Sequence, residues 1–270
     1  MDVIAQRLAA VRQEMQAAGC AALVVPRADE YLGEYIPAHN ERLRWLTGFT
    51  GSAGFLLVTL DRAAIFVDGR YTVQVRQEVS PELFEYCRFG EDSHTTWLAA
   101  NLPQGAKVCC DTRMHPLKWY RDTATALHSK GLQLLACPHN IIDACWHDRP
   151  APVVGRALLL SQQFTGESSI SKRRRIGATI AEKGAQAALV FAPDSISWLL
   201  NIRGTDIPKL PVLQSLALLE ADGRVTLLAD PGRIPDGLDA HVGEGLKVLH
   251  QSETAAVLSG YRGKTVLADP

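Results

Sequence analysis

Apolar residues recur every three or four positions over the first 18 residues of the chain, with charged residues between them. This spacing predicts a surface helix over residues 2–18 that ends at Gly19, and the apolar run 21–25 predicts a buried strand after it. Further strands are predicted at residues 55–59, 63–67, 108–110 and 132–136, and further helices at 71–79, 94–101 and 116–129. Strands that alternate with helices indicate an α/β layer structure.

The second half of the sequence repeats the order of the first half. Each half has a helix, a glycine and an Ala-Leu-Val strand, then a Trp-Leu pair, and then two strands that each end at an aspartate. The matching segments are 19–24 with 184–190, 45–46 with 198–199, 62–68 with 224–230, and 107–111 with 264–269. A proline-rich stretch, Arg149 to Pro152, joins the halves. We therefore expect two copies of one α/β unit, over residues 1–150 and 151–270.

The two copies differ in length. After Asp111 the first copy continues through a helix and a strand to about Cys137, whereas the sequence ends at Pro270, one residue after the equivalent Asp269. A unit without its last helix and strand would leave an apolar sheet edge uncovered. We expect the 270 residues to be part of a longer polypeptide; a second domain that is natively shorter is the alternative.

Composition narrows the class of protein. The chain has 28 Lys and Arg against 29 Asp and Glu, a net charge of −1, which argues against a nucleic-acid or membrane-surface binder that works by bulk electrostatics. With 47% apolar and 21% charged residues, neither disorder nor a coiled coil fits. No run approaches the roughly 18 apolar residues of a spanning helix, and no leader pattern opens the chain, so no membrane partner or signal peptide is expected.

The cysteines and histidines show no metal-binding spacing. The six cysteines, without a C-x-x-C pair, are interpreted as reduced and structural, which predicts a cytoplasmic protein. Cys109 and Cys110 are expected to point to opposite faces of one strand, which disfavours a redox role. The eight histidines are scattered singly, so no metal site is expected in this chain. The six cysteines are Cys20, Cys87, Cys109, Cys110, Cys137 and Cys145.

Three polar motifs are candidates for function. The segment Gly48 to Gly54 is interpreted as a tight turn, since Ser52 has no nearby histidine to act as its base. Arg70 follows a strand in Asp68-Gly69-Arg70-Tyr71, where a guanidinium can hold a peptide carbonyl or carboxylate; a salt bridge within the domain is the alternative. The basic run Lys172 to Arg175 is expected to be a solvated helix face, rather than a nuclear signal or phosphate site.

These motifs together resemble a known family. The chain is similar, over nearly its whole length, to the two N-terminal domains of the cytosolic-type Xaa-Pro aminopeptidases (aminopeptidase P), which belong to the creatinase-like, M24-type metallopeptidases. The matching segments are Glu34-Tyr35-Ile36-Pro37-Ala38, Gly48 to Gly54, Asp68 to Tyr71, Asp143-x-x-Trp146-x-x-Arg149-Pro150, and Trp198-Leu199-x-Asn201-Ile202-Arg203-Gly204-x-Asp206.

The resemblance implies a fold and separate roles for the N-terminal and C-terminal domains. It implies two tandem creatinase N-terminal-type domains, each a mixed β-sheet flanked by helices, the second incomplete at its C-terminus. A C-terminal catalytic domain of pita-bread fold would hold two divalent metals, usually Mn²⁺, on ligands outside these residues. The N-terminal domains would wall the substrate cleft and support a homodimer. Arg70 matches the family's arginine that contacts bound peptide. The loop after Asp206 departs from the family pattern at residues 210–216, which puts its contacts to the catalytic domain in doubt.

Three functional hypotheses follow. The first is the non-catalytic portion of a metal-dependent aminopeptidase that removes the N-terminal residue from peptides with proline second. This portion would be inactive alone and would have its own catalytic domain, a second copy and the peptide as partners. The second is a non-enzymatic peptide- or histone-binding module on the same fold. The third, action on creatine-like small molecules, fits poorly because the motifs match the peptidase branch.

Overall fold

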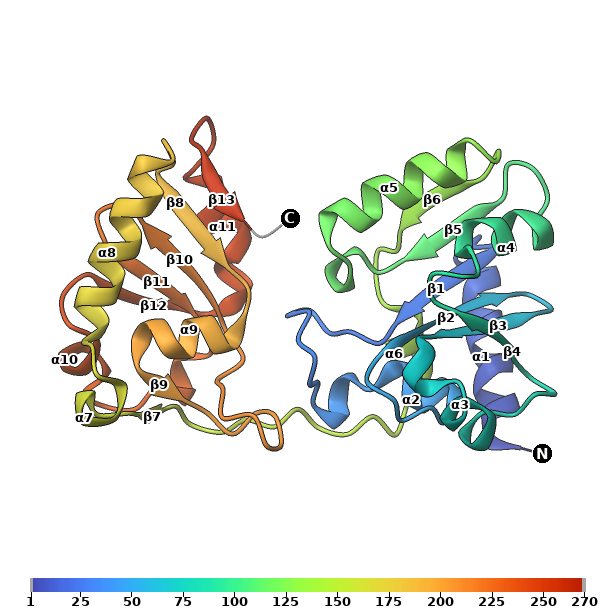
Figure 1. Cartoon of the computed structure of the whole chain (residues 1–270), viewed down its shortest axis with the longest axis horizontal. Helices are drawn as coiled ribbons and strands as arrows, with labels where there is room; N and C mark the ends of the chain where they lie inside the picture. The colour runs from blue at the N-terminus through green and yellow to red at the C-terminus, as the bar shows by residue number, and fades with distance from the viewer. Residues whose placement is uncertain (1, 269–270) are drawn as a thin grey trace. The chain divides into compact units, whose positions relative to one another are not determined.

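Two main β-sheets, each covered by helices, and a short two-stranded sheet make up the described part of the protein (Figure 1). The structure is a computed structural model that describes residues 2–268, and the chain divides into two compact units between Ala151 and Pro152. Both sheets mix parallel and antiparallel strands. The expected α/β fold class is confirmed.

The first unit contains a six-stranded sheet of order β4-β3-β2-β1-β5-β6. Strand β2 runs antiparallel to both of its neighbours, and all the other pairs are parallel. Every strand except β2 therefore ends at the same edge, which we call the carboxyl edge. The strands are β1 (Ala22–Pro26), β2 (Gly54–Thr59), β3 (Ala63–Val67), β4 (Glu85–Arg88), β5 (Lys107–Cys110) and β6 (Gln133–Ala136).

Helices cover both faces of this sheet because alternate strand residues point to opposite sides. Leu23 and Val25 of β1 pack in a core that includes residues of α1, α2 and α6, whereas Val24 packs in a second core that includes residues of α4 and α5. The helices are α1 (Val3–Ala17), α2 (Arg42–Thr47), α3 (Gln74–Glu78), α4 (His94–Asn101), α5 (Leu117–His128) and α6 (Ile141–Cys145), with short 3₁₀ turns η1 (Ala38–Asn40), η2 (Gly69–Tyr71) and η3 (Thr112–Met114).

The second unit repeats this topology. Its main sheet has the order β12-β11-β10-β8-β13, with β10 antiparallel to both neighbours and the other pairs parallel, as in β4-β3-β2-β1-β5. Among residues 2–268 this sheet has no counterpart of β6. The strands are β8 (Ala187–Val190), β10 (Leu216–Glu220), β11 (Val225–Leu228), β12 (Leu246–Leu249) and β13 (Val266–Ala268), and a separate pair joins β7 (Leu158–Leu159) to β9 (Ile202–Arg203). The helices are α7 (Gln162–Thr165), α8 (Ser169–Glu182), α9 (Pro193–Leu200), α10 (Leu238–Val242) and α11 (Thr254–Ser259), with 3₁₀ turns η4 (Pro231–Arg233) and η5 (Gln251–Glu253).

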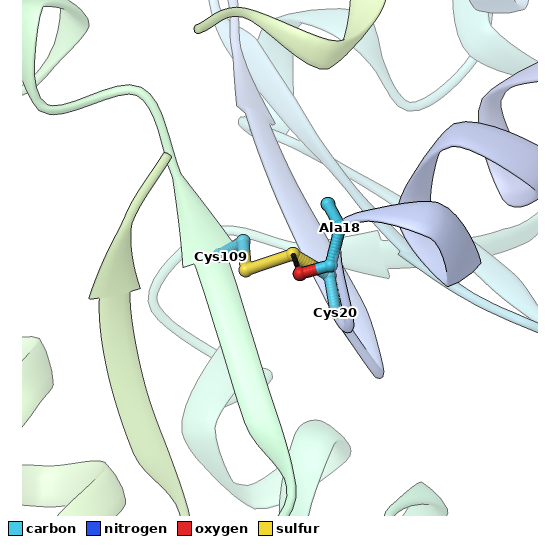
Figure 2. Close-up of a disulfide and its surroundings, with 3 residues drawn as sticks. All are labelled: Ala18, Cys20 and Cys109. Carbon is cyan, nitrogen blue, oxygen red and sulfur yellow. Dashed lines mark hydrogen bonds between the residues drawn. A yellow bond between two sulfur atoms is a disulfide. The ribbon is translucent and has the colours of Figure 1, made fainter. Parts of the chain in front are cut away.

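A disulfide joins Cys20 to Cys109, as Figure 2 shows. Gly19 turns the chain after α1 with a φ of +66°, and the two cysteine Cα atoms then lie 6.0 Å apart, within the usual range for a disulfide. The interpretation of all six cysteines as reduced is therefore wrong for these two. The two cysteines are 89 positions apart, so sequence spacing gave no sign of the pair. Cys109 and Cys110 do lie in cores on opposite faces of the sheet.

Two of the four basic residues at the start of α8 are buried, which corrects the expectation of a solvated helix face. Lys172 is 2% exposed and Arg173 is 1% exposed, whereas the next two arginines are exposed. The Lys172 ammonium donates to the Trp198 carbonyl (2.9 Å) and to Asn201 Oδ1 (2.7 Å). The Arg173 guanidinium donates to four backbone carbonyls, those of Gly223, Val242, Gly243 and Glu244. These bonds fix α8 to the chain around it.

Candidate functional site

Arg70 lies on η2, directly after β3, at the carboxyl edge of the first sheet. Its backbone N–H donates to Asp68 Oδ1 (2.9 Å), and its Nη2 donates to Asp68 Oδ2 (2.7 Å). The ion pair within the domain, considered above as the alternative, is thus present, and its hydrogen bond lowers the pKa of the Asp68 carboxyl. The Arg70 side chain is nevertheless 66% exposed. Open α/β sheets bind ligands at this edge, so Arg70 is placed to meet one.

The glycine-rich segment, Gly48 to Gly54, bends closely against the residue that follows Arg70, and this agrees with the close backbone approach expected of it. The Ser52 and Tyr71 hydroxyls lie 2.8 Å apart, and the Phe49 and Tyr71 rings meet edge to face with centroids 5.6 Å apart. The Ser52 hydrogen bond lowers the pKa of the Tyr71 phenol. Gly51 passes so close to these rings that a Cβ there would lie 2.2 Å from Phe49 Cζ. The segment therefore positions Tyr71, and Ser52 bonds a tyrosine rather than a catalytic base.

Helix α3 holds the other side of this turn. The Thr50 N–H donates to Glu78 Oε2 (2.8 Å) and the Thr50 hydroxyl donates to Glu78 Oε1 (2.6 Å). Burial raises the pKa of Glu78, but the bonds from Thr50 and Gln74 and the charge of Arg44 together outweigh it, so the pKa is lowered and Glu78 accepts these bonds as a carboxylate. Gln74 adds a bond to the Thr50 hydroxyl (2.8 Å). Sequence reasoning missed Gln74 and Glu78, whose i, i+4 spacing on a helix is only a weak signal.

The segment from Asp143 to Pro150 has a structural role. The Arg42 side chain is 1% exposed and donates to both Asp143 oxygens (2.6 and 2.9 Å), and its Nη2 also reaches Glu30 at 3.1 Å. Arg149 bonds Asp143 at 2.8 Å. The Trp45 and Trp146 rings stack with centroids 5.5 Å apart. These contacts fix α6 to α2, so the Asp143 to Pro150 segment stabilises the fold, and none of these contacts points to a binding or catalytic role.

The family-matching segment of the second unit, Trp198 to Asp206, is also structural. Asp206 is 1% exposed and pairs with Arg233, and its Oδ2 accepts the Gln214 N–H at 2.6 Å. A Cβ on Gly204 would lie 2.4 Å from the Val212 carbonyl oxygen, so the chain can pass here only as glycine. The loop 210–216, where this sequence departs from the family pattern, therefore contacts Gly204 and Asp206, which match that pattern.

No described group of side chains suits a manganese pair. Among residues 2–268 the one group of three or more His, Cys, Asp or Glu ligand atoms within 4.8 Å of one another is Cys20, Cys109 and Cys137. Two of these sulfurs form the disulfide, and Mn²⁺ prefers oxygen ligands. None of the described helices is both long and apolar enough to cross a bilayer.

Comparison with known families identifies the class of domain. Models of the creatinase/prolidase N-terminal domain match residues 7–144 and again residues 148–270. The chain therefore belongs to the creatinase/prolidase N-terminal domain family and carries two such domains in tandem.

Curated relatives of this chain are Xaa-Pro aminopeptidases. Xaa-Pro aminopeptidase 2 of Homo sapiens is 32% identical over 229 residues, which are 84% of this chain and 34% of that protein. Aminopeptidase P1 of Arabidopsis thaliana is 30% identical over 256 residues, which are 91% of this chain and 39% of that protein. The chain thus spans between a third and two fifths of the length of these relatives.

A solved structure shows the same fold. The crystal structure of an X-prolyl aminopeptidase from Caenorhabditis elegans, a cytosolic enzyme with a di-nuclear active site, matches with a TM-score of 0.91 at 24% identity. The match covers 97% of this chain and 45% of that one.

Proposed function

We propose that this chain is the N-terminal, non-catalytic portion of a metal-dependent Xaa-Pro aminopeptidase that removes the N-terminal residue from peptides with proline second. The observation that carries the proposal is that two creatinase/prolidase N-terminal domains occupy this chain in tandem, while its aminopeptidase relatives are more than twice as long. In this account the two divalent metals, expected to be Mn²⁺, lie on a C-terminal domain outside this sequence. The chain walls the substrate cleft and supports a homodimer.

The cytoplasm is the compartment that we propose for this enzyme. The cytosolic character of the similar nematode enzyme supports it. The argument from six reduced cysteines no longer does, because the structure pairs Cys20 with Cys109.

Arg70 is the residue that we propose to contact the peptide. Its guanidinium lies 5.3 Å from the centroid of the Tyr71 ring and bonds Asp68, so its orientation is set before a ligand arrives. A planar guanidinium so held can bind a peptide carbonyl or carboxylate with two parallel hydrogen bonds.

The chain offers a matched control for this role. Arg113 repeats the arrangement of Arg70 on η3, after β5: its N–H donates to Asp111 Oδ1 (3.1 Å) and its Nη2 to Asp111 Oδ2 (2.6 Å). In the full-length enzyme, Arg70→Ala should raise KM or lower kcat/KM for Xaa-Pro peptides by about tenfold, the loss expected for one charge-assisted hydrogen bond. Metal content should not change, and Arg113→Ala should leave the kinetics near those of the wild type. Unaltered kinetics in Arg70→Ala would mean that Arg70 does not contact the peptide and serves only in its ion pair with Asp68.

A further inference from the structure

The first unit contains a cavity of about 660 Å³ that the proposed peptide contact does not use. It opens beside the end of β1 at Pro26 and the start of β2 at Gly54, at the carboxyl edge of the sheet, and no residue of the Asp68 to Tyr71 turn lines it. Its volume lies within the range of about 300 to 1,000 Å³ typical of small-molecule sites.

Aromatic rings form the walls of this cavity. The Phe55 ring stacks on Phe66 (centroids 4.5 Å apart) and meets Phe89 edge to face (5.0 Å). The wall continues through three further rings: His94 meets Phe55 at 5.8 Å, Trp119 stacks on His94 at 6.3 Å, and His115 stacks on Trp119 at 3.7 Å. Such walls favour a flat ring, because aromatic faces and edges attract one another.

The pKa of both histidines of the wall is lowered, which favours the neutral form of each ring. Burial lowers the pKa of His94, and burial, only partly opposed by Asp111, lowers the pKa of His115 to about 4. The imidazoles therefore act as uncharged rings and hydrogen-bonding groups, and they carry no charge toward a ligand.

Two buried nitrogens on residues that line the cavity have no hydrogen-bond partner. They are Arg27 Nε and His115 Nε2. The Arg27 side chain is only 9% exposed; its Nη1 donates to the Glu34 carbonyl, and its Nη2 lies 3.6 Å from Glu41. A buried donor without an acceptor is unfavourable, so an acceptor brought by a ligand would remove that cost.

The acidic residues at the rim are already paired. Both Glu91 oxygens lie 3.1 Å from Arg88 Nη1, and Asp92 Oδ2 accepts the Arg88 N–H at 2.7 Å. Among the described lining residues, Arg27 is the permanent positive charge. Arg27 Nε is still an unpaired donor, and a carboxylate oxygen is the acceptor that makes the strongest hydrogen bond to it.

We propose that this cavity binds a small aromatic carboxylate. Its ring lies against the aromatic walls, and its carboxylate accepts hydrogen bonds from Arg27 Nε and from His115 Nε2–H. The proposal does not depend on the peptidase assignment, because it rests on residues that the peptide contact does not use.

Calorimetric titration of the 270-residue chain with 2-naphthoate tests the proposal directly. We expect one site with a Kd below about 1 mM. Two other probes separate the contribution of the carboxylate charge from that of the aromatic ring. The first, 2-naphthamide, keeps the ring without the charge, and the second, cyclohexanecarboxylate, keeps the charge without the aromatic ring. Both should bind at least about tenfold more weakly. Absence of saturable 2-naphthoate binding, or equal affinity for all three probes, would overturn the proposal.

Variants then locate the site. Arg27→Met should weaken 2-naphthoate at least about tenfold and 2-naphthamide less than about twofold. Phe89→Ala, at a side chain that is 48% exposed, should weaken both probes without unfolding the domain, and it keeps the test available if Arg27→Met does not fold. Arg113→Met, which removes an arginine that does not line the cavity, is the control. Undiminished 2-naphthoate binding in Phe89→Ala would refute this location.

Discussion

The Ser52 and Tyr71 hydroxyls lie 2.8 Å apart, and this contact joins the glycine-rich turn to the turn that carries Arg70. Tyr71 also packs edge to face on Phe49, which is buried. The orientation of Arg70 therefore depends on the path of a neighbouring loop, and that path depends on the absence of a side chain at Gly51.

Gly51→Ala tests this dependence. The new Cβ would lie 2.2 Å from Phe49 Cζ and 2.8 Å from Tyr71 Cδ1, so a buried ring must move. We expect the free energy of unfolding in urea to fall by about 1–3 kcal/mol, as for an overpacked core. Gly69→Ala is the matched control in the adjoining turn, because a Cβ there meets nothing within 4 Å, and it should change stability by less than about 0.5 kcal/mol. Equal effects of the two substitutions would contradict the close approach at Gly51.

Asp143→Asn tests the buried ion-pair network. The substitution removes the carboxylate that binds the buried Arg42 guanidinium in two-pronged fashion. We expect a loss of about 3 kcal/mol in the free energy of unfolding, because a buried charge loses its main partner. Asp122→Asn, in the exposed pair with Lys118, should cost less than about 0.5 kcal/mol. Similar losses for the two variants would mean that the buried Arg42–Asp143 pair stabilises the fold no more than the exposed Lys118–Asp122 pair does.

The same pair predicts a dependence on pH. Burial raises the pKa of Asp143, but the hydrogen bonds and charges of Arg42 and Arg149 outweigh it, so the pKa is lowered in the folded protein. A lowered carboxyl pKa contributes stability above the unfolded value of about 4, and that contribution is lost as the pH falls through the folded pKa. The stability difference between wild type and Asp143→Asn should therefore be constant from pH 7 to about pH 5 and shrink below about pH 4. A stability difference that already shrinks above pH 5 would mean that the pKa of Asp143 is raised, not lowered, in the folded protein.

Cysteine alkylation tests the disulfide and the state of the remaining thiols. Unfolded without reductant, the chain should take up four iodoacetamide labels, on Cys87, Cys110, Cys137 and Cys145, and six after reduction. In the folded protein, burial is the main cause that raises the pKa of Cys87 and of Cys137 to about 11. Since the thiolate is the reactive form, their labelling rates should still rise between about pH 9 and pH 10. Six labels without reduction would show that Cys20 and Cys109 are not joined.

Local patterns in the sequence were enough to predict most elements of the first sheet. The continuous apolar run of β3 and the Ser93-capped helix α4 carry their own signals, and both lie where they were predicted. Strand β4 was missed because Glu85-Tyr86-Cys87-Arg88 has no clear apolar face and pairs only at the sheet edge.

Features that depend on long-range contacts could not be predicted in this way. In the sequence, Lys172 and Arg173 belong to an ordinary basic run. Their burial depends on carbonyl groups that lie 26 to 71 positions away along the chain. The Cys20–Cys109 disulfide and the aromatic cavity likewise assemble from separate segments of the chain. By contrast, the Arg70 turn could be placed at the carboxyl edge, because its position follows directly from the end of one strand.

If this chain is the non-catalytic portion of a longer enzyme, it should not hydrolyse Xaa-Pro peptides alone, and a comparison of turnover tests this. Release of the first residue from an Xaa-Pro peptide should be measured with Mn²⁺ present, for the 270-residue chain and for the native gene product at equal concentrations. We expect turnover by a native product more than twice this size and none above a metal-free blank by the 270-residue chain. Turnover by the 270-residue chain alone would contradict the account, and a native product that binds peptide without turnover would favour the binding-module hypothesis instead.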